Sequence, residues 1–74
     1  MATPAIHTVP SEGGWANKRA GSDDVLSTHD TKADAVAAGR TQAMEDEAEH
    51  IIHEQDGTIG ERNSYGSDPR SSSG

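Results

Sequence analysis

The sequence has no cysteine and no phenylalanine, and its only large aromatic side chains are Trp15 and Tyr65. Without cysteine, neither a disulfide framework nor a cysteine-ligated zinc site can form. Hydrophobic residues make up only 30% of the 74 positions, and a chain of this length gains only a few kcal/mol from one small core. The sequence therefore predicts one small domain and excludes two.

Long apolar runs and basic residues are also scarce. No run approaches the roughly 20 residues of a membrane-spanning helix, and the first residues lack the pattern of a secretory signal. Six lysines and arginines stand against 13 aspartates and glutamates, for a net charge of −7. Such a chain is a poor ligand for phosphate backbones. We therefore expect a cytoplasmic protein without membrane contact, for which nucleic acid is a disfavoured partner.

The pattern of polarity divides the chain into a flexible N-terminus (1–5), one domain (6–65) and a disordered Ser/Gly-rich tail (66–74). Thr31 with Asp34 three residues later fits a capping box, which predicts a helix from there to about residue 47. Alternating polarity predicts strands at 6–9, 15–19, 25–29, 49–54 and 59–62. The order β-β-β-α-β-β predicts an α+β fold, with one helix on a face of a small antiparallel sheet.

One face of the predicted helix is formed mostly by small side chains, which are Ala35, Val36, Gly39 and Ala43, with Met44 beside them. A glycine inside a helix costs about 1 kcal/mol relative to alanine. Close packing against a sheet is the best reason to keep Gly39 at this position.

The last two strands are predicted to form a hairpin. Asp56-Gly57 between two strand-like runs is a strong signal for a two-residue turn. With this turn, Ile52 and Ile59 lie on one face of the sheet and Ile51 lies on the other. Ile52 is then a core residue.

Four histidines, His7, His29, His50 and His53, raise the question of a metal site. His50 and His53 would share a face on a helix, but on a strand residues three apart point to opposite faces. We therefore expect structural or surface histidines and no metal or other cofactor. The alternative is that two imidazoles and a carboxylate such as Glu54 gather from different elements.

The sequence also lacks the motifs of common catalytic sites. Its serines fall in turns and in the tail without a Gly-x-Ser-x-Gly elbow, and Gly13-Gly14 precedes a strand rather than a helix. A catalytic acid needs a partly dry, concave site, which so little apolar mass hardly builds. We therefore expect no enzymatic activity and no catalytic residue.

Charge is unevenly distributed along the chain. The segment 45–56 contains no lysine or arginine but has six acidic residues, which are Glu45, Asp46, Glu47, Glu49, Glu54 and Asp56. An acidic run often serves solubility alone. The functional interpretation is a protein-interaction module that docks with these residues on a basic partner surface.

A second interpretation rests on the one aromatic and basic strand. Trp15, Lys18, Arg19 and the more distant Arg62 would form the binding face of a nucleic-acid-binding accessory protein. The structural alternative makes Trp15 the largest core residue of a domain that lacks phenylalanine. Exposed edge strands of the sheet would also allow a homodimer.

Several separated motifs, in the same order, resemble those of small bacterial and phage proteins grouped as domain-of-unknown-function family 2188. The motifs are Ile6-His7-Thr8-Val9-Pro10, Gly14-Trp15-Ala16-Asn17-Lys18, His29-Asp30-Thr31-Lys32-Ala33-Asp34-Ala35, Ile51-Ile52-His53, Asp56-Gly57-Thr58-Ile59 and Ser64-Tyr65-Gly66-Ser67-Asp68-Pro69. The resemblance implies a compact domain that occurs alone in short chains, and it implies no activity, cofactor or catalytic residue. Asn17 departs from this pattern, because an aliphatic residue is usual there. Glu54-Gln55 stands where a glycine and a basic residue are common, and Gly60 stands where a basic residue is common, which weakens a nucleic-acid role.

Overall fold

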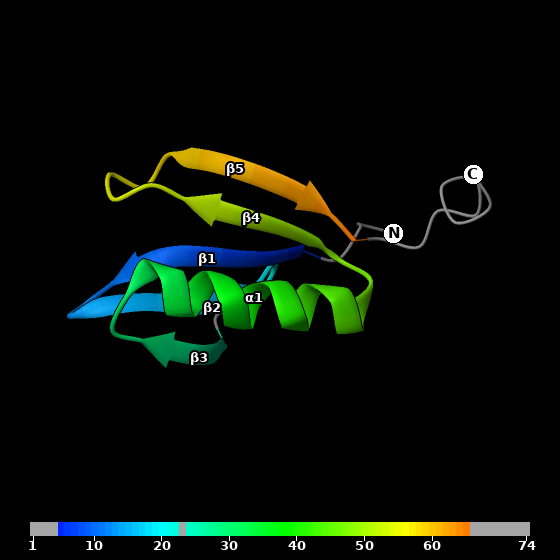
Figure 1. The fold of residues 1–74 in the computed structure, drawn as a ribbon, viewed down its shortest axis with the longest axis horizontal. Coiled ribbons are helices and arrows are strands. Elements are labelled where there is room, and N and C mark those ends of the chain that lie inside the picture. Colours follow the sequence, from blue (N-terminus) through cyan, green and yellow to red (C-terminus); the bar gives the residue numbers. More distant parts are fainter. Residues whose placement is uncertain (1–4, 23, 66–74) are drawn as a thin grey trace.

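The computed structural model describes residues 5–22 and 24–65, so the predicted tail and all but the last residue of the predicted N-terminal segment lie outside the described part. Its elements are β1 (Ala5–Ser11), β2 (Gly14–Arg19), β3 (Val25–His29), α1 (Lys32–Asp46), β4 (Glu49–His53) and β5 (Ile59–Ser64). The predicted α+β class and the order β-β-β-α-β-β are confirmed (Figure 1). Within the described residues, no helix is long and apolar enough to cross a membrane.

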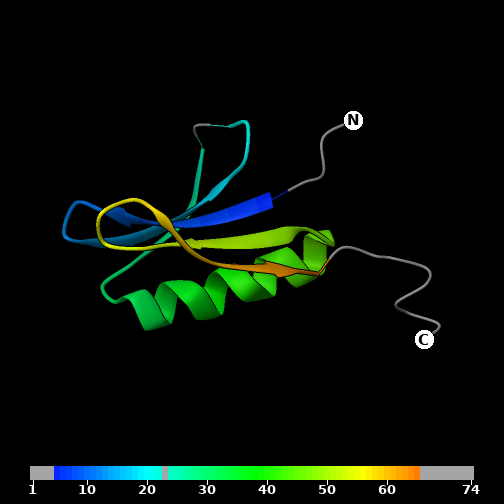
Figure 2. The same ribbon diagram turned by 90° about the horizontal axis from the view of Figure 1, so that it is seen from above.

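The five strands form one sheet in the order β3-β2-β1-β4-β5 (Figure 1). Three neighbouring pairs are antiparallel, as predicted, whereas β1 and β4 are parallel, so the sheet is mostly antiparallel. The physical reason is that α1 carries the chain back along the sheet, so that β4 starts at the same end as β1. Figure 2 shows that α1 covers one face of the sheet only. The β1–β2 and β4–β5 turns and the start of α1 therefore lie at one end (Figure 1).

The helix starts as its sequence predicts, but its buried face is narrower than predicted, because Val36 is only half-buried and Met44 is 56% exposed. Thr31 is the N-cap, and its hydroxyl accepts a hydrogen bond from the Asp34 N–H at 3.2 Å. Ala35, Gly39 and Ala43 are the buried residues of α1. These small side chains allow the helix axis to lie close to the strands beneath it.

The apolar core lies under the C-terminal half of the helix. Ile6, Ala43 and Ala48 are fully buried, and the partly buried Leu26 and Tyr65 pack against them. Burial of these side chains is the main stabilising term at this end of the domain.

Under the middle of the helix, the core is polar. Thr8, Asn17 and His50 are almost fully buried and come from three neighbouring strands. The Thr8 Oγ1 atom lies 2.5 Å from Asn17 Oδ1 and 2.7 Å from His50 Nε2. The Asn17 amide nitrogen donates to the Ala35 carbonyl at 2.9 Å and to Ser27 Oγ at 3.1 Å. These bonds tie four strands and the helix together.

The donors in this cluster determine the tautomer of His50. The Thr8 hydroxyl has one proton, and it donates to Asn17 Oδ1 because that oxygen can only accept. His50 Nε2 must therefore carry the proton that it shares with Thr8 Oγ1. His50 Nδ1 is left buried without a partner among the described residues. Protonating Nδ1 would create a buried charge, so His50 is held neutral.

The β4–β5 turn is longer than predicted. The Glu54 N–H donates to the Thr58 carbonyl at 2.6 Å, and the Gly57 N–H donates to the Glu54 carbonyl at 2.8 Å. A register shift at Ile52/His53 then pairs His53 with Ile59. Ile52 is 5% exposed under the helix, whereas Ile59 is 53% exposed beside His53 on the opposite face. The prediction that both isoleucines share a face is therefore wrong.

We expect Gly39→Ala to destabilise the domain, although alanine is the better helix former by about 1 kcal/mol. A Cβ at this position would lie 2.5 Å from Asn17 Oδ1, 2.6 Å from His50 Nε2 and 2.8 Å from Thr8 Oγ1. The helix must then move off the sheet, at a cost of about 1–3 kcal/mol of unfolding free energy. Urea denaturation measures this loss. Ala37→Gly on the exposed side is the control, and it should cost only about 1 kcal/mol. A stability gain in Gly39→Ala would contradict the close packing.

We also expect acid to destabilise the domain through His50. Burial lowers the pKa of His50, Arg40 of α1 lowers it further, and Glu61 of β5 raises it. Below the ordinary histidine value of 6.5, the unfolded chain therefore binds a proton that the folded chain does not. The unfolding free energy should fall as the pH drops from 7.5 to 5.5, and this slope should be smaller in His50→Gln. Equal slopes in urea titrations of the two proteins would contradict this assignment.

Candidate functional site

The six predicted acidic residues do not form one surface. Glu45, Asp46 and Glu47 lie at the C-terminal end of α1, and we call these three residues the acidic corner. The half-buried Glu49 follows at the start of β4. The other two residues, at positions 54 and 56, lie in the turn at the far end of β4 (Figure 1). The acidic corner is therefore the densest part of the predicted surface.

Within the acidic corner, Glu45 and Glu47 are exposed and Asp46 is partly exposed. Asp46 accepts hydrogen bonds from the Arg19 guanidinium at 2.8 Å and from the Gln42 amide at 3.1 Å. These two bonds lower the pKa of Asp46, and the bond from Arg19 has the larger effect. The Asp46 carboxylate is thus ionised at neutral pH.

The acidic corner lowers the stability of the helix that carries it. The C-terminal end of a helix has partial negative charge, and each carboxylate there costs about 0.3–1 kcal/mol at low salt. No basic residue lies in the last turn of α1. The helix ends in a Schellman motif, in which the Glu47 N–H donates to the Met44 carbonyl and the Ala48 N–H donates to the Ala43 carbonyl. Glu47 has φ 52° and ψ 51°, a left-handed conformation that glycine usually takes.

The two acidic residues of the β4–β5 turn interact with other residues of the domain. The Asp56 carboxylate accepts from the Thr58 hydroxyl at 2.7 Å and from the Thr58 N–H at 3.0 Å. These bonds, the hydroxyl first, lower the pKa of Asp56. Glu54 lies 3.5 Å from the Lys32 ammonium. Both carboxylates thus have a partner within the domain.

The four residues of the alternative binding face are also separated. Trp15 and Arg19 point to the side of α1, where Trp15 is only 7% exposed and Arg19 is paired with Asp46. The Lys32 ammonium lies 5.5 Å from the centre of the Trp15 ring. Lys18 alternates with these residues along β2 and points to the opposite face. Trp15 is therefore a core residue under the start of the helix, as the structural alternative predicts.

The face opposite α1 carries a row of side chains across four strands. The strand pairings place Lys18 beside His7, His7 beside Ile51, and Ile51 beside Arg62. No other described element packs on this face. Lys18 and Arg62 form no ion pair among the residues that the structure describes. Lys18 of β2 and Arg62 of the edge strand β5 therefore share one uncovered surface.

Two histidines meet on this uncovered face. His7 Nδ1 and His53 Nε2 are 2.9 Å apart, and the ring planes are tilted by 32°. His53 Nδ1 lies 3.0 Å from the Gly57 carbonyl. The pKa of His7 is lowered, most strongly by burial and then by the neighbouring His53 and Arg62. His50 lies on the other face under the helix, as the alternation along a strand predicts.

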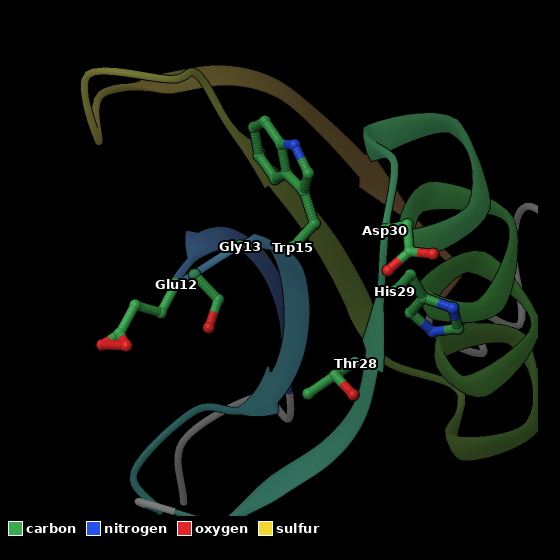
Figure 3. A pocket seen from close by; sticks show the side chains of 7 residues that line it. Glu12, Gly13, Trp15, Thr28, His29 and Asp30 are labelled. Carbon is green, nitrogen blue, oxygen red and sulfur yellow. The ribbon is translucent and has the colours of Figure 1, made fainter.

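A pocket of about 230 Å³ lies between the β1–β2 turn and the end of β3. Figure 3 shows that the Glu12 side chain extends away from the Trp15 indole, while Asp30 and His29 lie on the other side of the pocket. The polar groups of this pocket thus do not converge on one point. A catalytic site requires such convergence. Across 5–22 and 24–65, no group of three histidines or carboxylates is placed to hold a metal ion.

A family model described as "Uncharacterized protein conserved in bacteria (DUF2188)" matches residues 6–65 of the chain. This range covers the whole helix and all of the sheet except the first residue of β1. Comparison with curated proteins and with solved structures gave no match. The family description names no activity, ligand or partner.

We expect Glu47→Gly to stabilise the domain by about 1 kcal/mol, because glycine adopts the left-handed conformation without steric cost. Glu47→Ala is the matched control, since it removes the same charge but keeps the Cβ atom. It should change the unfolding free energy by only a few tenths of a kcal/mol. Thermal or urea unfolding of the three proteins measures both effects. If Glu47→Gly is no more stable than Glu47→Ala, the backbone at this position carries no cost.

Proposed function

The chain belongs to the DUF2188 family of uncharacterised bacterial proteins, and we propose that it is a non-catalytic protein-interaction module. Its docking surface is the acidic corner, Glu45, Asp46 and Glu47, and its partner presents a basic surface. The proposal includes the cytoplasmic location expected from the sequence, which fractionation of the host cell tests.

One observation carries this proposal: the acidic corner opposes stability in two ways at once. Its carboxylates lie at the negative end of the helix dipole, and Glu47 takes a conformation that glycine takes more easily. Acids needed only for solubility can occupy any exposed position at no such cost. Local strain and unfavourable charge are typical of positions kept for binding.

The surroundings of the acidic corner fit a basic partner. Arg19 is the basic residue that pairs with it among the described residues, and this pair uses Asp46 alone. Glu45 and Glu47 are exposed and form no ion pair within the described ranges. A net charge of −7 further favours association with a basic surface.

Nucleic-acid binding has less support from the geometry. Of its four predicted residues, only Lys18 and Arg62 share the uncovered face. Two cations neutralise few phosphates, and affinity for a phosphate backbone depends on that number. Trp15 is buried under Lys32 and offers no free ring for a base to stack on.

The test compares two double variants that change the net charge equally. Glu45→Lys with Glu47→Lys reverses the acidic corner but keeps Asp46 on Arg19, and lysine at a helix C-terminus favours the helix. Glu12→Lys with Asp30→Lys is the control at the other end of the domain. Partners captured from the host cell by the wild-type chain are identified, and their association rates are measured at low and physiological salt.

We expect the corner variant to associate about tenfold more slowly than the control variant at low salt. Added salt should reduce the difference, since exposed charges are screened. Equal association rates for the two variants would contradict docking through the acidic corner. The sheet edges β3 and β5 would then be the next surfaces to test.

A further inference from the structure

The histidine pair on the uncovered face has a defined arrangement of protons. The Gly57 carbonyl can only accept a hydrogen bond, so His53 Nδ1 carries a proton and donates it at 3.0 Å. In the neutral ring, His53 Nε2 then has a free lone pair. This lone pair faces His7 Nδ1 at 2.9 Å, and the proton of His7 Nδ1 bridges the two nitrogens.

This arrangement of His53 is the one that histidine ligands of metals use. A ligating imidazole usually donates its second ring N–H to a carbonyl or carboxylate, which fixes its tautomer and orientation. The Gly57 carbonyl already does this for His53. His7 Nε2 has no partner among the described residues and is not buried, so its ring can take either tautomer.

The 2.9 Å between the two nitrogens is the length of the hydrogen bond that joins them, and it also allows one metal ion to contact both. Two nitrogens 2.9 Å apart that each lie about 2.0–2.1 Å from an ion subtend an angle of about 90° at it. This is the angle between neighbouring ligands in the tetragonal geometry of Cu²⁺ and Ni²⁺. A tetrahedral zinc ion would need the nitrogens about 3.3 Å apart at the same bond length.

We propose that His7 Nδ1 and His53 Nε2 form a binding site for a tetragonal divalent transition-metal ion, Cu²⁺ or Ni²⁺. The ion replaces the bridging proton, which moves through water from His7 Nδ1 to His7 Nε2, so the imidazole stays neutral. Water completes the coordination, because no third histidine or carboxylate of the described residues joins the pair. The site does not depend on the acidic corner, which lies at the other end of the domain.

The neighbours of the pair restrict which ions can bind. Lys18 lies beside His7 in the strand register, and Arg62 lies near enough to lower the pKa of His7. Their positive charges repel cations that bind mainly by charge. Mg²⁺ and Ca²⁺ prefer oxygen ligands and should not bind here. Ions with a strong preference for imidazole nitrogen overcome this repulsion.

The first test is a calorimetric titration of the full chain with Ni²⁺, with Mg²⁺ as the control ion. His7→Gln and His53→Gln should each weaken Ni²⁺ binding at least about tenfold, and the double variant should be no weaker than either single variant. His29→Gln, outside the pair, should bind like the wild type. Wild-type affinity in either pair variant, or equal loss in His29→Gln, would overturn the proposal.

The second test needs no substitution and covers the case in which a variant fails to fold. A small amount of paramagnetic Cu²⁺ added to the wild-type chain broadens the NMR signals nearest to the bound ion. The amide signals of His7, His53 and their strand neighbours should broaden first. Broadening centred on the N-terminal amine or on His29 would overturn the proposal, because the ion would then bind elsewhere.

Discussion

The close approach of α1 to the sheet at Gly39 is the contact on which the other interactions depend. Only a residue without a side chain leaves room for Thr8, Asn17 and His50 to hydrogen-bond beneath the helix. These bonds connect strands that are distant in the sequence, with Thr8 and His50 separated by 42 positions. This chain has few hydrophobic residues, and a buried polar cluster therefore helps to hold its one helix against the sheet. Asn17 is the member that also binds the helix backbone.

Much of the fold could be predicted from local patterns. The change from a two-residue to a 3.6-residue period located α1. Of its predicted buried face, the structure buries Ala35, Gly39 and Ala43 but leaves Met44 exposed. The parallel pairing of β1 with β4 could not be predicted in this way, because local periodicity does not determine which strands become neighbours. The longer turn was missed for a similar reason. The Asp56 and Thr58 side chains bond each other and shift the register of Ile59, which the Asp-Gly signal alone does not reveal.

The candidate sites were less predictable than the fold. Alternation along each strand places His53 and His7 on one face or the other, but only the β1–β4 register brings them to 2.9 Å. The acidic run was visible as charge, yet its division depends on β4, which separates the acidic corner from Glu54 and Asp56. The side chains from Trp15 to Arg19 do not share one face either. Alternation along β2 places Lys18 on the face opposite Trp15 and Arg19. Proximity along the chain was therefore a poor guide to a shared surface.

The single helical layer leaves this domain with two surfaces of different chemistry. The helix end carries carboxylates that the helix dipole disfavours, whereas the uncovered sheet face carries Lys18, Arg62 and the histidine pair. Because the sheet lies between them, a change on one surface need not alter the packing of the other, and effects of well-separated positions on stability usually add. Among the described side chains of the sheet, Arg19 alone forms an ion pair with the acidic corner, and this partly exposed pair contributes little to stability. The buried cluster at Gly39 therefore sets the fold, while both surfaces can be altered independently around it.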